Sequence, residues 1–192
     1  MFPASNAYDY PLLIKHILTN ATRAHARQEI VSHAKTRLSY EAFERRVHQL
    51  AHSLNNCGID EGVRVGVMDW DTNRYLECFF AVPMMGATLF TINVRLSPAQ
   101  VLYTINHGAP DLIIVHRDFM PLINEVKSGF ERDITIIPIG DGDGYEAWIG
   151  QAADRFDFPD FDEARTATLF YTTGTTGNPK GVSYSQRQLV LH

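Results

Sequence analysis

Residues 168–181, TLFYTTGTTGNPKG, join an apolar strand to a glycine- and threonine-rich segment that ends with a single lysine. Gly174, Gly177 and Gly181 allow the backbone to turn tightly and to approach a ligand without an intervening Cβ. Their amides can form an anion-binding nest, the threonine hydroxyls add donors, and Lys180 adds a positive charge. The segment therefore predicts a polyphosphate cradle at the end of a strand.

Two alternatives to a phosphate cradle fit this segment less well. A Walker A loop requires Gly-Lys-Ser/Thr, but here Pro179 precedes Lys180 and Gly181 follows it. The second alternative is a flexible linker of glycine and threonine. A linker gives no reason for one lysine behind a proline after an apolar strand, and Pro179 favours an extended Asn178. We therefore favour the phosphate loop.

Strands and helices alternate upstream of this loop. Residues 63–67 alternate in polarity as a strand does, and 112–115 form a continuous apolar run typical of a strand buried on both faces. Further strands are expected over 88–92 and 134–137, and helices over 72–85, 97–108 and 118–127. The pattern predicts an α/β fold with a doubly wound, mostly parallel sheet flanked by helices, and with ligand-facing loops at the carboxyl ends of its strands.

The sequence of residues 1–38 predicts a small N-terminal unit that precedes the main domain. Leu13, Ile17, Ala21 and Ala24 fit one face of an N-terminal helix, and residues 29–40 predict two short strands around a turn. Ser39 is the expected N-cap of the next helix, and Gly58 its end. The apolar positions expected on that helix are Phe43, Val47, Leu50 and Leu54. We expect residues 1–38 to form this N-terminal unit, and 39–192 the main domain.

Composition excludes several classes of protein. The chain has 192 residues, which is enough for one domain or for one domain and part of a second. Its net charge of −5 argues against nucleic-acid or anionic-membrane binding. Two cysteines cannot build a disulfide framework or a four-thiolate metal site. The longest apolar run, 78–90, is too short to span a bilayer, and no secretion signal is apparent. We expect a cytoplasmic protein without a transmembrane segment.

Several other candidate features favour structural roles. Residues 141–144, DGDG, suggest a calcium loop, but Tyr145 and Ala152 break the EF-hand pattern, so a surface turn is preferred. His48 and His52 have helical metal-ligand spacing without a third ligand, which favours a solvated helix face over zinc. Arg45 and Arg46 are expected to be surface charges on the same helix. The acidic and aromatic run 154–163 is expected to be a loop held to the core by its phenylalanines.

Residues 171–181 resemble the phosphate-binding signature of the adenylate-forming superfamily, which includes acyl-CoA synthetases, luciferases and peptide-synthetase adenylation domains. The resemblance extends over most of the chain. Segments 80–87 (FAVPMMGA), 93–98 (NVRLSP), 103–107 (YTINH) and 184–192 (YSQRQLVLH) look like medium- and long-chain fatty acyl-CoA ligases in particular. Those relatives usually carry histidine where this chain has Gln186, and the lost titratable ring argues against an acid–base role there.

The resemblance implies a ligase that works in two steps. A fatty-acid carboxylate attacks the α-phosphate of ATP and releases pyrophosphate, and the thiolate of coenzyme A then attacks the acyl adenylate. It implies that Lys180 is catalytic, because it neutralises charge on the leaving pyrophosphate, and that Thr172 helps to hold Mg²⁺. The nucleotide-binding residues that it implies are Thr172, Thr173, Gly174, Thr175, Thr176, Gly177, Asn178, Lys180 and Gly181.

The superfamily's adenine-binding, ribose-binding and metal-binding segments follow the phosphate loop, as does its mobile C-terminal domain. We therefore expect this chain to be the N-terminal part of such a ligase, inactive alone, and to associate as a homodimer through its N-terminal segment. Aryl-acid CoA ligases and peptide-synthetase adenylation domains remain alternatives within the enzyme class. A non-catalytic nucleotide-binding or dimerisation module is the alternative from another class.

Overall fold

In the computed structural model, which describes residues 10–33, 36–140, 144–172 and 177–192, a six-stranded sheet runs in the order β6-β5-β3-β4-β7-β8. Its neighbouring strands are parallel except for β7 and β8, which form an antiparallel hairpin. The strands of this sheet are β3 (Arg64–Met68), β4 (Thr88–Thr91), β5 (Leu112–His116), β6 (Thr135–Ile139), β7 (Thr166–Thr172) and β8 (Lys180–Ser185). The α/β class and the mostly parallel sheet predicted from the sequence are confirmed.

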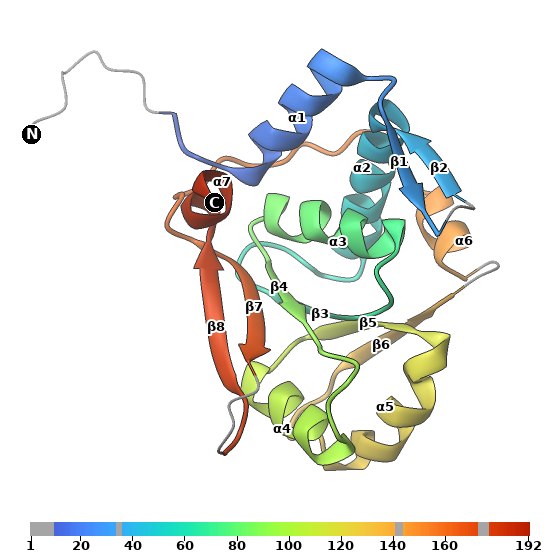
Figure 1. Cartoon of the computed structure of the whole chain (residues 1–192), viewed down its shortest axis with the longest axis vertical. Helices are drawn as coiled ribbons and strands as arrows, with labels where there is room; N and C mark the ends of the chain where they lie inside the picture. Colours follow the sequence, from blue (N-terminus) through green and yellow to red (C-terminus); the bar gives the residue numbers. More distant parts are fainter. Residues whose placement is uncertain (1–9, 34–35, 141–143, 173–176) are drawn as a thin grey trace, which may run out of the picture.

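Helices cover both faces of this sheet (Figure 1). The helices are α1 (Ile14–His25), α2 (Tyr40–Asn56), α3 (Asn73–Met84), α4 (Pro98–Gly108), α5 (Met120–Val126), α6 (Gly144–Gly150) and α7 (Gln186–Leu191). Leu112 and Ile114 of β5 pack with α1, α2, α3 and α6, whereas Ile113 and Val115 pack with α4 and α5. Alternate residues of one strand thus enter opposite cores, as expected for a doubly wound sheet.

Side-chain caps determine where the long helices begin. The Ser39 hydroxyl accepts a hydrogen bond from the Ala42 amide at the start of α2, as the sequence predicted. Ser97 and Gln100 form a reciprocal capping box at the start of α4. The predicted apolar positions of α2 are all buried, namely Phe43, Val47, Leu50 and Leu54. Local sequence therefore specifies both the start and the buried face of α2.

Other elements differ from the expectations. Ile14 and Leu18 form the buried face of α1, and Ile17, which was expected to be buried, is 40% exposed. Contacts with α2 determine the rotation of α1, so its own periodicity was not sufficient. The strands β1 (Glu29–Ser32) and β2 (Thr36–Ser39) form the predicted antiparallel pair, whereas α6 and β8 were not predicted. No helix in the described ranges is long and apolar enough to cross a membrane.

The expectation that Arg46 is a surface charge was wrong. Its guanidinium donates to Glu77 at 2.7 Å and to Glu146 at 2.6 Å, and so connects α2 with α3 and α6. Glu77 is fully buried and also accepts hydrogen bonds from Asn73 at 2.9 Å and from the Tyr145 hydroxyl at 2.6 Å. Three described side chains, those of Arg46, Asn73 and Tyr145, thus donate to the single buried carboxylate of Glu77.

The two histidines of α2 do not form a solvated face, as had been expected, because each contacts the backbone of the acidic loop. His48 Nδ1 accepts a hydrogen bond from the Phe156 amide at 2.8 Å, and His52 Nε2 lies 2.7 Å from the Arg155 carbonyl oxygen. Phe156 and Phe158 also pack against the core, which confirms the aromatic anchoring expected for the acidic loop. Of the candidate calcium turn, residues 141–143 lie outside the described residues, and Gly144 begins α6.

We predict that Glu77→Ala lowers the free energy of unfolding by about 3–5 kcal/mol, because it leaves Arg46 and the Tyr145 hydroxyl buried without their shared acceptor. Urea denaturation at pH 7 measures this loss. The matched control is Glu29→Ala, which breaks the exposed Glu29–Arg37 pair at 2.8 Å and should cost less than about 1 kcal/mol. Equal losses in the two variants would contradict the central role of Glu77.

A second prediction concerns pH. Hydrogen bonds from Arg46 lower the pKa of Glu146 from its ordinary value of 4.5. Folding therefore favours ionised Glu146, so its contribution is present above that value and disappears as the pH falls through the lower pKa of the folded state. Glu146→Gln should reduce stability at pH 7, by less than about 1 kcal/mol because the carboxylate is half-exposed, and the difference should vanish in acid. Urea titrations across this range test it, with exposed Glu125→Gln as control.

Candidate functional site

The predicted phosphate loop connects the two strands of the β7–β8 hairpin. Thr172 is the last residue of β7 and Lys180 is the first of β8, and the two lie opposite each other in the ladder. The Thr172 hydroxyl donates to the Lys180 carbonyl oxygen at 3.5 Å, a long hydrogen bond. Because β7 runs parallel to β4, the loop leaves the sheet at the carboxyl edge of the parallel strands. Open α/β sheets commonly bind ligands at this edge.

The structure brings together the predicted site residues that it describes. Thr172, Asn178 and Lys180 are exposed, and Gly177, also exposed, has a φ of +102° that favours glycine. Pro179 is buried between them and so fixes the end of the loop to the hairpin. The remaining predicted loop residues, Thr173, Gly174, Thr175 and Thr176, lie outside the described residues.

Gly181 differs from the role expected for it. It lies within β8 rather than in a turn, opposite Tyr171 of β7. A Cβ placed on Gly181 would lie 3.5 Å from ring carbons of Tyr171 and from Leu169 Cδ1, which are ordinary contacts. The packing around Gly181 therefore leaves room for alanine.

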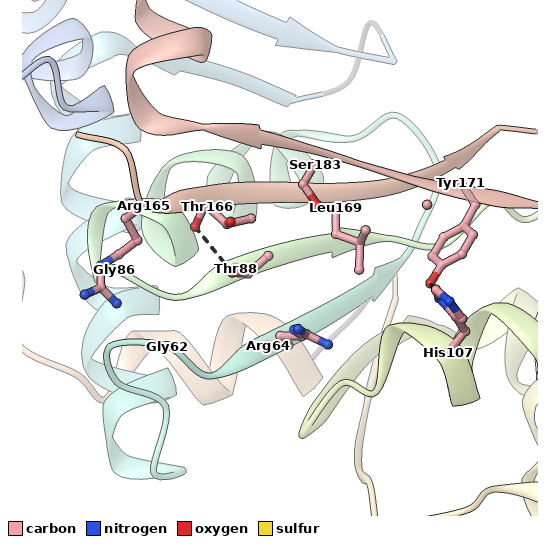
Figure 2. Close-up of a pocket in the computed structure, with 11 residues that line it drawn as sticks. Gly62, Arg64, Gly86, Thr88, His107, Arg165, Thr166, Leu169, Tyr171 and Ser183 are labelled. Atoms are coloured by element: carbon pink, nitrogen blue, oxygen red, sulfur yellow. Dashed lines mark hydrogen bonds between the residues drawn. The ribbon is translucent and has the colours of Figure 1, made fainter. Parts of the chain in front are cut away.

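A cavity of about 460 Å³ lies along the hairpin, on the side of α4 (Figure 2). Its lining residues are Gly62, Arg64, Gly86, Thr88, His107, Arg165, Thr166, Leu169, Tyr171, Gly181 and Ser183. Figure 2 shows Tyr171 of β7 and His107 of α4 directed toward one another, and the Tyr171 hydroxyl lies 2.6 Å from His107 Nδ1. Sequence reasoning missed this pair, since only the alternation of β7 indicates the side of the sheet on which Tyr171 lies.

Burial has a clear electrostatic effect on this tyrosine. Tyr171 is 7% exposed, and its burial raises the pKa of the phenol above the ordinary value of 10.0. Tyr103 raises this pKa further, and Arg64 opposes the shift. The phenol therefore keeps its proton at neutral pH and remains a hydrogen-bond donor.

Gln186 holds the helix that follows the hairpin. Its fully buried side-chain amide donates to the Pro83 carbonyl oxygen at 2.8 Å and accepts from the Ile14 amide at 3.1 Å. Both ends of the amide are used, so Gln186 links α7 to α3 and α1. These two hydrogen bonds give Gln186 a structural role.

At the carboxyl end of β7 the described residues thus offer hydroxyl, amide and ammonium donors to a solvent-exposed ligand. This donor set suits a polyanion such as a chain of phosphates. Within the described residues, no group of three or more His, Cys, Asp or Glu side chains could hold a metal ion.

Comparison with known proteins identifies the family. Residues 18–191 match the AMP-binding enzyme family. The chain is 34% identical to a medium-chain-fatty-acid–CoA ligase from Ectopseudomonas oleovorans over 94% of its length and 36% of that protein's. It is also 34% identical to a long-chain-fatty-acid–CoA ligase from Thermus thermophilus, over 100% of its length and 36% of that protein's. The chain thus spans about a third of the length of these relatives.

A solved structure supports the fold. The anthranilate CoA ligase AuaEII, in complex with anthranoyl-AMP, superposes with a TM-score of 0.85 at 23% identity, over 93% of this chain and 35% of that one. At this identity the likeness concerns the fold alone. The family match over nearly all of the described chain shows that this protein belongs to the AMP-binding enzyme family.

Proposed function

We propose that this chain is the phosphate-binding part of an ATP-dependent fatty acyl-CoA ligase. The observation that carries the proposal is the hairpin loop itself, in which Thr172 and Lys180 lie opposite each other at the carboxyl edge of the parallel strands. In the proposed reaction a fatty-acid carboxylate attacks the α-phosphate of ATP and pyrophosphate leaves. The thiol of coenzyme A then displaces AMP from the acyl adenylate, which forms the thioester.

The residues of the loop act mainly on charge and position. Negative charge builds up on the leaving pyrophosphate, and the Lys180 ammonium and the loop donors stabilise it where it develops. Catalysis of phosphoryl-type transfer depends largely on such stabilisation and on the alignment of the reacting atoms. Mg²⁺, when bound to the nucleotide, neutralises part of the phosphate charge. We propose that the exposed Thr172 hydroxyl helps to hold this ion. In the same proposal Thr173, Gly174, Thr175, Thr176, Gly177, Asn178 and Gly181 contact the phosphates.

Two alternatives within the enzyme class are aryl-acid CoA ligases and peptide-synthetase adenylation domains. The 34% identity to two fatty-acid ligases favours a fatty acid, whereas the structural likeness to an anthranilate CoA ligase concerns the fold alone. Carboxylate-dependent ATP–pyrophosphate exchange by the complete protein distinguishes them when octanoate, palmitate, benzoate and an amino acid are compared. Exchange with benzoate or an amino acid alone would overturn the fatty-acid proposal, and exchange with none would favour a non-catalytic nucleotide-binding module.

We predict that Lys180→Ala in the complete ligase lowers the rate of adenylation about 10²–10³-fold, the usual loss when one group that stabilises transition-state charge is removed. Its melting temperature should stay unchanged, because Lys180 is exposed and contributes little to packing. The matched control is Lys127→Ala, which removes an exposed lysine from the segment after α5 and should leave the rate unchanged. A Lys180→Ala rate within twofold of the wild type would contradict the role of Lys180.

The 192-residue chain by itself should show no fatty-acid-dependent ATP–pyrophosphate exchange above that of its own Lys180→Ala variant. The loop can contact the phosphates of ATP. Alignment of the adenine, the ribose and the fatty-acid carboxylate requires further binding groups. Alignment of reactants is commonly worth about 7–11 kcal/mol, which corresponds to roughly five to eight orders of magnitude in rate. Fatty-acid-dependent exchange by this chain would show that residues 1–192 already hold the whole site.

We further propose that the ligase is a cytoplasmic homodimer in which residues 1–38 contribute to the dimer contact and 39–192 are part of the AMP-binding domain. Ile17 and Leu76 are 40% and 36% exposed at a hollow of about 250 Å³ between α1 and α3, which supports an apolar contact there. Cys57 and Cys78 are unpaired, which fits a reducing compartment.

We predict that Ile17→Glu shifts the complete ligase from dimer to monomer in sedimentation, because it places a charge in the proposed apolar contact. A wild-type ligase that sediments as a monomer would contradict this contact.

A further inference from the structure

The hydrogen bond between His107 and Tyr171 connects α4 to the phosphate loop. Tyr171 is the last buried residue of β7 and directly precedes Thr172, the first exposed residue of the loop. Its hydroxyl lies 2.6 Å from Nδ1 of His107, which occupies the last turn of α4 (Figure 2). An element more than sixty residues upstream thus contacts the side chain next to the loop.

Aromatic rings and the end of α4 pack around this pair, which also lines the cavity along the hairpin. The ring of Tyr171 contacts Phe90 with centroids 5.5 Å apart and meets the His107 ring edge-on at 5.7 Å. On its other side His107 stacks with Tyr103 at 5.7 Å. A Cβ on Gly108 would come within 2.8 Å of the Phe90 ring, so only glycine lets the end of α4 approach this closely. The last turn of α4 therefore has a fixed position relative to β4 and β7.

The end of α4 is also tied to β3. Arg64 donates a hydrogen bond to the Gly108 carbonyl oxygen at 2.9 Å, and so pairs one of the free carbonyl groups of the last helical turn. Ala109, which caps the helix, has a φ of +46°, so the chain turns sharply away immediately after this contact. The ring contacts of His107 and the bond from Arg64 to Gly108 thus hold the end of α4 in place independently of the hydrogen bond to Tyr171.

The phenol of Tyr171 keeps its proton at neutral pH, because burial raises its pKa. A protonated phenol hydroxyl can donate or accept, and the role of His107 Nδ1 depends on the tautomer of the ring. In either direction the bond ties the last turn of α4 to the residue that precedes Thr172.

We propose that His107 is a positioning residue for the phosphate loop, because its hydrogen bond to Tyr171 fixes the start of the loop from which Thr172 and Lys180 present their donors. The inference rests on the proposed function of the loop. Thr172 and Lys180 are paired in the β7–β8 ladder, and the long hydrogen bond from the Thr172 hydroxyl to the Lys180 carbonyl oxygen, at 3.5 Å, adds only a weak side-chain constraint. A loop held in its binding geometry before ATP arrives loses less conformational freedom when it binds.

The first experiment measures ATP–pyrophosphate exchange by the complete ligase. Tyr171→Phe keeps the ring and removes only the hydroxyl, and it should raise KM for ATP about three- to tenfold, the range expected for one hydrogen bond, while KM for the fatty acid stays unchanged. His107→Leu should have the same effect, and the double variant should be no worse than either single variant. His107→Asn should retain near-normal KM, because its side-chain amide can replace Nδ1 either as acceptor or as donor.

The matched control is Tyr145→Phe, which removes another buried hydroxyl that donates at 2.6 Å, but to Glu77 and on the opposite face of the sheet. It should lower the melting temperature and leave KM for ATP unchanged. If Tyr171→Phe lowers the melting temperature and likewise leaves KM for ATP unchanged, His107 has only a structural role and the proposal is overturned. Additive effects in the double variant would also overturn it.

A second experiment separates this inference from the proposed function. NMR of the ¹⁵N-labelled complete ligase without ligand should show faster amide hydrogen exchange at Thr172 and Lys180 in Tyr171→Phe than in the wild type. If the wild-type ligase shows no ATP–pyrophosphate exchange with any acid, the proposed function fails, and amide hydrogen exchange alone then decides whether His107 fixes the loop ends. Unchanged amide hydrogen exchange in Tyr171→Phe would overturn the inference.

Discussion

Burial of both faces of the central parallel strands is the constraint on which the other features depend. Leu112, Ile113, Ile114 and Val115 of β5 are all at most 1% exposed, so each face of the sheet requires its own layer of helices. Crossover helices supply part of these layers, because parallel strands cannot be joined by tight turns. The same crossovers place the carboxyl ends of the parallel strands at one edge, and this edge is where β7 ends.

The layer that covers the second face also determines what lies beneath the loop. Val101 and Ile105 of α4 are fully buried in the core on that face, and the next turn of the helix carries His107 and Gly108. Since β7 pairs with β4, Tyr171 comes beside Phe90 and within reach of that turn. The contact between α4 and the loop strand is therefore a consequence of how the sheet is covered.

The sequence was sufficient where local chemistry decides the structure. The apolar run of β5, the caps at Ser39 and Ser97 and the alternation of strands and helices predicted the architecture. It was insufficient where distant residues decide. The periodicity of α1 could not show that Gln186 bonds the amide of Ile14, and nothing around Arg46 indicates the two carboxylates that enclose it. The short helix α6 has too few turns for periodicity to identify.

The same distinction explains why the loop residues were predicted and their support was not. Glycine, threonine and lysine favour the prediction of a phosphate loop because their own backbone and side-chain groups are the donors that a bound phosphate needs. A residue that acts through another has no such mark, since the significance of His107 depends on a tyrosine that only the folded sheet brings within 2.6 Å. Geometry at the site therefore depends on the order of the strands as much as on the motif. A sheet with the same loop but without β4 beside β7 would leave Tyr171 without the contacts that hold it.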